Sequence, residues 1–292
     1  MDPARPDTAI AVPLRRRALA LWMEADPATK AEQTRTLWAE RDRHPLDAGP
    51  ICDGVAGDPG AMQAPGRPAR PGLVDPRNVP SRTPFTVEGR AALLHSIAHI
   101  EFNAINLALD AVWRFDAMPA RFYIDWLQVA NEEALHFALL REHLLELGFD
   151  YGDFDAHEGL WLMTQRTADD VLARMALVPR TLEARGLDAT PPLQAKFERA
   201  GDARAVEILA IILRDGNRHG RISVSVTSPS ATAGIAGCAS SAGSIRCTTT
   251  ACWPRVIRRR SCVRRSTLRP DAPQDSPTKR SRCSADGAGK AD

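Results

Sequence analysis

The sequence predicts an all-α fold built around a four-helix bundle. Apolar residues recur at helical spacing in four long stretches, 86–115, 120–147, 168–186 and 203–215. No stretch shows the apolar–polar alternation that is typical of strands. Long helices joined by mixed loops, with no strand signal, are typical of a helical bundle.

Two shorter elements are expected before the bundle. Residues 12–41 can form one or two helices, broken at Asp26-Pro27, because proline suits the first turn of a new helix. The following residues are rich in Pro, Gly and Asp, which indicates an extended strap. We therefore expect an N-terminal helical segment, a linker, a bundle with an incomplete fourth helix and a disordered basic tail, at 1–44, 45–84, 85–222 and 223–292.

The composition changes sharply near residue 216. Residues 216–292 contain 14 Lys and Arg against four Asp and no Glu, whereas residues 1–215 contain 24 Lys and Arg against 32 acidic residues. Five of the six cysteines lie in this tail, which leaves only Cys52 before it and excludes a disulfide framework there. No apolar run reaches the ~18 residues of a membrane helix, and the N-terminus is a poor signal peptide. These features predict a cytoplasmic protein with no membrane partner.

One short motif in the second long helix carries the chemistry. Glu133 and His136 are three residues apart and therefore share a helix face. That face is otherwise apolar, so the carboxylate and the imidazole should point into the core. A buried carboxylate is unfavourable unless it is paired or binds a cation, and an E-x-x-H step on a bundle helix is one way to hold metal ions. The alternative is a surface glutamate beside a hydrogen-bonded core histidine.

The first long helix places a second carboxylate on its core stripe. Glu101 stands among apolar residues at helical spacing, from Ile97 to Val112. His95 and His99 are four residues apart on a different face, where we expect solvent or a supporting role beside the ligands.

Several motifs together resemble one family. HSIAHIEFNAINLALD, VANEEALHF, YGDFDAHEGLW, RMALVPRTLEARGLDATP and ILAIILRD are similar, in order, to the DUF455 family of ferritin-like proteins, over about residues 66–215. The resemblance implies a ferritin-like four-helix domain. That domain would be related to the tRNA-modifying di-iron hydroxylase that acts on isopentenyl-adenosine derivatives.

The resemblance also implies metal ligands. Glu101, Glu133, His136 and Glu183 match the family's carboxylates and histidine, a donor set that suits two iron or manganese ions. In the family the fourth helix continues as DEIGH after LRD. Here Gly216 stands at the place of the glutamate, and a histidine falls at the expected offset. The candidate metal ligands are thus Glu101, Glu133, His136, Glu183 and His219.

The tail has three interpretations: a disordered basic tail, a nucleic-acid-binding arm, or translation out of frame. A shifted reading frame joins the third base of each codon to the first two bases of the next codon. With suitable third bases, residues 224–251 can then be read as IGHVAIGNRWHRWLREQRGLDPVHHYGL. That string contains the missing IGH and continues as an amphipathic helix. We therefore favour a frameshift.

Three functions remain open. The first is a carboxylate-bridged di-metal oxidoreductase, such as a hydroxylase, that uses dioxygen on an unknown small molecule or modified RNA, possible as a homodimer. The second is a non-catalytic helical metal-binding protein or scaffold, whose polar core residues pair with Arg and Tyr. The third is an RNA-associated protein that uses the basic tail. No P-loop, dinucleotide fingerprint, serine elbow or C-x-x-C pair supports other chemistry.

Further residues are assigned weaker roles. One is a possible substitute carboxylate and one a possible support for the ligands. Two belong to a loop, where packing of the loop is favoured over gating of the pocket or support of the ligands, and two are expected in the core. They are, in that order, Glu207, His143, His157, Glu158, Trp126 and Trp161.

Overall fold

The computed structural model describes residues 12–49, 51, 64–78, 80, 82–177 and 179–226, without the side chains of 177–187 and 220–226. All of these residues belong to one compact unit. Most of the predicted tail, 227–292, lies outside the described residues, as does Cys52.

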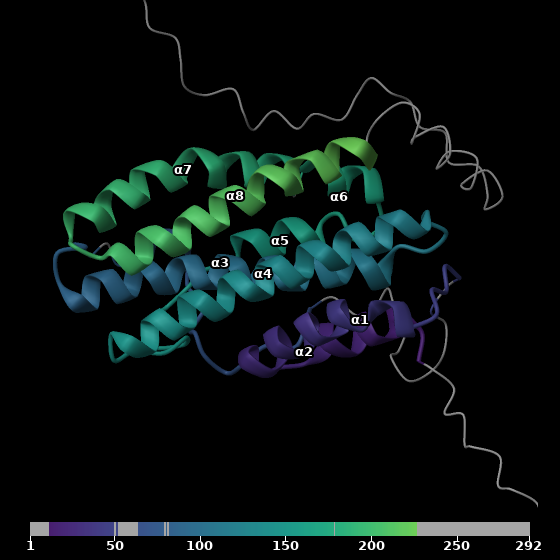
Figure 1. The fold of residues 1–292 in the computed structure, drawn as a ribbon, viewed down its shortest axis with the longest axis horizontal. Helices are drawn as coiled ribbons and strands as arrows, with labels where there is room; N and C mark the ends of the chain where they lie inside the picture. Colours follow the sequence, from purple (N-terminus) through teal and green to yellow (C-terminus); the bar gives the residue numbers. More distant parts are fainter. Residues whose placement is uncertain are drawn as a thin grey trace, which may run out of the picture. The chain divides into compact units, whose positions relative to one another are not determined.

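The described part of the chain is helical, which confirms the all-α prediction. A central pair, α3 and α4, is covered by α1 and α2 on one side and by α7 and α8 on the other (Figure 1). Two short helices, α5 and α6, connect α4 to α7. The bounds are α1 Leu14–Met23, α2 Pro27–Ala39, α3 Val87–Arg114, α4 Ala120–Glu146, α5 Gly159–Gln165, α6 Val171–Leu177, α7 Pro179–Arg199 and α8 Ala203–Val226, with 3-10 turns η1 Arg41–Arg43 and η2 Pro76–Asn78. Within the described residues, extended pairing is limited to the bridge between Leu73 and Ala156.

Helix starts follow the predicted signals. The Asp26 side chain accepts a hydrogen bond from the Thr29 amide at 2.8 Å, and Pro27 is the first residue of α2, as predicted. Thr86 caps α3 by accepting from the Gly89 amide at 3.0 Å. Asp202 caps α8, since its Oδ1 accepts from the Ala205 amide at 3.0 Å.

The predicted third helix is wrong in its bounds. A single helix over 168–186, kinked at Pro179 and ended at Gly186, was expected, whereas the described helices here are α6, Val171–Leu177, and α7, which begins at Pro179. α7 then runs through Gly186 and both Pro191 and Pro192 to Arg199. Local breakers are overridden here because α7 packs against α8.

The fourth helix is longer than its pattern indicates. Its apolar spacing fades at 216, yet α8 continues to Val226, four residues beyond the expected end of the bundle. The α7–α8 turn is tight: Gly201 has φ +75°, and the Asp202 amide donates to the Phe197 carbonyl at 3.0 Å.

Two buried cations attach the N-terminal helices to the central pair. The Arg15 guanidinium donates to the carbonyls of Val112, Trp113 and Phe115 at the end of α3. Lys30 donates to the Asn106 side chain of α3 and to the carbonyls of Trp22 and Gly66. Since a cation satisfies the unpaired carbonyls at a helix end, these contacts hold α3 firmly against α1, α2 and the strap.

Candidate metal centre

Three of the predicted ligands meet inside the bundle. His136 Nδ1 lies 3.2 Å from Glu101 Oε2 and 3.1 Å from Glu133 Oε2. The three residues each offer a ligand atom within 4.8 Å of the others. Their exposed fractions are only 6%, 9% and 1% for Glu101, Glu133 and His136. α3 and α4 therefore bring together two carboxylates and an imidazole, as the helical spacing predicts.

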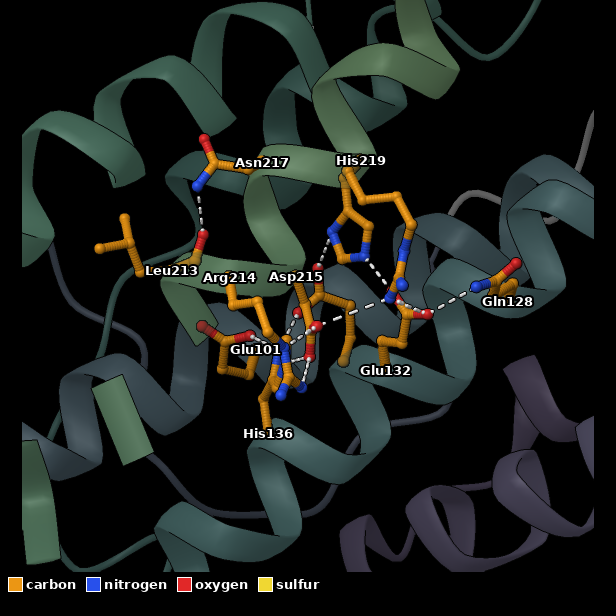
Figure 2. A network of polar contacts seen from close by, with 11 residues as sticks. Glu101, Gln128, Glu132, His136, Leu213, Arg214, Asp215, Asn217 and His219 are labelled. Atoms are coloured by element: carbon orange, nitrogen blue, oxygen red, sulfur yellow. Dashed lines mark hydrogen bonds and ion pairs between the residues drawn. The ribbon is translucent and has the colours of Figure 1, made fainter. Parts of the chain in front are cut away.

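The far side of the His136 ring contacts α8. Nε2 lies 3.0 Å from Asp215 Oδ2, and Arg214 donates to the same carboxylate (Figure 2). Asp215 thus fixes the ring so that Nδ1 faces the two glutamates. Such a carboxylate behind an imidazole is a common way to orient a metal-binding histidine.

A similar contact runs from α8 back to α4. His219 Nε2 lies 2.6 Å from Glu132 Oε2, and Nδ1 lies 3.3 Å from Glu133 Oε1. Arg218 also pairs with Glu132 (Figure 2). The predicted residue His219 is therefore buried against the glutamate of the E-x-x-H step.

The protonation of the cluster follows from its partners. Burial alone would lower the pKa of His136, but hydrogen bonds to Asp215, Glu101 and Glu133 raise that pKa well above its ordinary value. Asp215 accepts from Nε2 and the ionised Glu133 accepts from Nδ1, so both ring nitrogens donate and the ring is an imidazolium.

The two glutamates differ in charge. Burial, followed by the negative charge of Glu133, raises the pKa of Glu101 to about 8. Burial opposes ionisation of Glu133 as well, yet hydrogen bonds from Glu101 and His136 bring its pKa well below the ordinary value. At neutral pH Glu101 therefore holds a proton that it donates to Glu133, because two adjacent buried carboxylates do not both ionise without a cation.

Two other predicted ligands have different outcomes. Glu183 lies in α7, but its side chain is outside the described residues, so its assignment stays a prediction. Glu207 is exposed and pairs with Arg204 at 3.4 Å, on the outer face of α8. It is not a substitute ligand in this structure, because its side chain is exposed and paired with Arg204.

His95 and His99 do not face solvent, contrary to one of the two expected outcomes. Both are buried, and neither contacts the three candidate ligands. His95 Nε2 accepts from the Gly152 amide at 2.9 Å, and His99 Nδ1 lies 2.9 Å from the Tyr151 hydroxyl. The loop after α4 folds back over this face of α3, an approach between distant segments that no local pattern reveals.

The remaining assignments concern support and packing. His143 lies between Glu146 and Asp202, at 2.8 Å from each, and so connects α4 to the start of α8. Glu158 pairs with Arg67 of the strap, which favours loop packing. Trp126 and Trp161 are buried in the core, as predicted.

Sequence reasoning missed the roles of Glu132 and Asp215 in this centre. Glu132 directly precedes Glu133, about 100° around the helix, and therefore lies off the apolar stripe that identified Glu133. Asp215 ends the ILAIILRD motif, but its pairing with His136 joins residues 79 positions apart. In both helices an acidic residue stands four positions before the histidine, in E-E-x-x-H on α4 and D-G-x-x-H on α8. This shared spacing is the sequence signal that could have identified Glu132 and Asp215.

Replacing Glu101 with glutamine should change how stability depends on pH in the metal-free protein. The pKa of Glu101, about 8 in the folded state, exceeds its ordinary value, so between about pH 5 and 8 the folded state binds more protons than the unfolded state. This group therefore lowers the free energy of unfolding as the pH rises through that window, and Glu101→Gln removes that part of the slope. Urea unfolding at several pH values with a chelator measures it. Glu88→Gln, at an exposed glutamate of α3, should keep the wild-type slope, and an unchanged slope in Glu101→Gln would contradict the assignment.

Comparisons with known proteins agree with the resemblance seen in the sequence. None of the described helices has the length and apolar character to cross a bilayer. No solved structure matches the chain. An uncharacterized protein of Haemophilus influenzae is 58% identical over 159 residues, which are 52% of this chain and 55% of that relative. The chain thus spans about half the length of the curated relative it matches. Residues 23–224, more than half of the chain, match the model of the family described as protein of unknown function (DUF455), and the chain belongs to that family.

Proposed function

We propose that this protein binds divalent metal at the centre formed by Glu101, Glu133 and His136. The observation that carries the proposal is the burial of two carboxylates against one imidazole, with no lysine or arginine among the described contacts of Glu101 or Glu133. Buried carboxylates are paired, protonated or bound to a cation. Here the proton on Glu101 and the proton on the His136 ring offset the negative charge of the two carboxyl groups.

The donor set fits a metal of the iron or manganese type. Carboxylate oxygens are hard donors, and an imidazole nitrogen is a borderline donor, a mixture that suits these ions. His136 already has the orientation that a ligand needs, since Asp215 holds Nε2 and leaves Nδ1 facing the carboxylates. A cation would take the place of the two protons.

We further propose a ferritin-like centre for two iron ions, or manganese, in which Glu183 and His219 complete the ligand set. The support is the resemblance of the motifs and the contact of His219 with Glu133. Two iron ions bound there would supply the activation of dioxygen. The protein is then an oxygen-dependent oxidoreductase, such as a hydroxylase, and its substrate is a small molecule or a modified RNA.

Metal titration tests the binding proposal. Cobalt(II) or iron(II), added to the chelator-treated chain without oxygen, should bind, and Glu133→Ala and His136→Ala should weaken binding by at least about 100-fold, since each removes a direct ligand. Binding should also weaken as the pH falls from 8 to 6, because protons on Glu101 and His136 compete with the metal. Glu207→Gln, at an exposed carboxylate, serves as the matched control. Equal affinities in all four proteins would refute the site.

Oxygen consumption separates an oxidoreductase from a non-catalytic metal-binding protein. The iron-loaded chain should consume dioxygen with a reductant, at a rate above that of free iron, whereas iron-loaded His136→Ala should not exceed the free-iron rate. Stable metal binding with no oxygen uptake in any condition would favour the non-catalytic alternative.

We also propose a change of reading frame from about residue 224. The support is the string encoded in the shifted frame and the end of the family match at residue 224. Sequencing the gene across codons 205–230 and into the tail should reveal a single-base difference that restores a family-like continuation. An unchanged frame would sink the idea.

A further inference from the structure

α4 and α8 contact each other through reciprocal pairs. The acidic residue Glu132 of α4 holds His219 of α8 at 2.6 Å, and the acidic residue Asp215 of α8 holds His136 of α4 at 3.0 Å (Figure 2). In each helix the histidine comes four residues after its acidic residue. The two helices thus present the same arrangement to each other.

The reciprocity fails at one position. On α4, the residue between these two groups is Glu133, one after the acidic residue and three before the histidine, and its carboxylate belongs to the candidate metal centre. The corresponding residue of α8 is Gly216. α8 therefore supplies no carboxylate at the place that matches Glu133, and Asp215 does not replace it because it is held by His136 and Arg214.

The metal centre is consequently short of an oxygen donor on the α8 side. First-row divalent ions take about four to six donors each, so coordination positions stay open on two ions even when Glu183 and His219 join Glu101, Glu133 and His136. Gly216 is partly exposed, whereas Asp215 and His219 on either side of it are buried. Gly216 thus presents no side chain between the two buried residues. Glycine inside a helix also costs about 1 kcal/mol relative to alanine, so helix formation does not explain its presence.

We propose that Gly216 leaves a binding place for a small carboxylate that completes the metal centre. This inference rests on the proposed metal site. The matching position on α4 holds a carboxylate, Glu133, so an external carboxylate at Gly216 would supply the donor that α8 lacks. Two ionised glutamates and a divalent ion are together neutral, so the ions can accept a further anionic ligand. The proposal identifies the ligand as a small monocarboxylate or the carboxylate end of a substrate.

The test uses the full chain loaded with cobalt(II), whose visible spectrum reports its ligands. Titration with acetate or formate should shift the spectrum of the wild-type protein with saturation. In Gly216→Glu the new side chain occupies the place, so the acetate response should disappear or weaken at least about tenfold, while cobalt remains bound. Asn217→Glu is the matched control, since it adds the same carboxylate one residue away, at an exposed position of α8, and should respond like the wild type.

Gly216→Ala provides a second variant. Its methyl group narrows the place without adding a ligand and favours the helix, so the acetate response should weaken more than that of the smaller formate. Cobalt binding with no carboxylate response in the wild type, or with equal responses in the wild type and Gly216→Glu, would overturn this inference and leave the metal site intact. Absence of cobalt binding would overturn both.

Discussion

The constraint on which this structure depends is the burial of two carboxylates side by side. Glu101 and Glu133 come from different helices and are both buried inside the bundle. Desolvation and mutual repulsion oppose two negative charges in such a place. The folded chain answers with an imidazolium and a shared proton, and an arrangement that needs this much compensation is the kind of site where function is found.

The rest of the fold keeps that cluster in position. α3 carries Glu101 and is held from one side by Arg15 and Lys30, two buried cations of the N-terminal helices. On another face of α3, the buried residues His95 and His99 form hydrogen bonds with Gly152 and Tyr151 of the loop that follows α4. The N-terminal segment and the strap thus act as part of the support of the bundle, since they fix the helix that presents the first ligand.

α8 decides how the ligands are oriented. Its Asp215 holds the His136 ring, and its His219 approaches Glu133, so the donors of α4 are set by a helix distant in the chain. The start of α8 is fixed in turn by Asp202, which caps the helix and pairs with His143 of α4. A shift of α8 along its axis would move Asp215 away from His136, so the contact between α4 and α8 would set the affinity of the proposed metal centre.

The sequence by itself determined the all-α fold, the burial of Glu101, Glu133 and His136, and the start of the last bundle helix near residue 203, because helical periodicity and capping are local properties that the order of residues encodes directly. It did not determine the extent of α7, where packing against α8 overrides Gly186 and Pro191, nor the fate of His95 and His99, which a returning loop covers. Only the tertiary structure paired Asp215 with His136 and Glu132 with His219, since contacts between residues about 80 positions apart depend on how helices pack and leave no periodic trace in either helix.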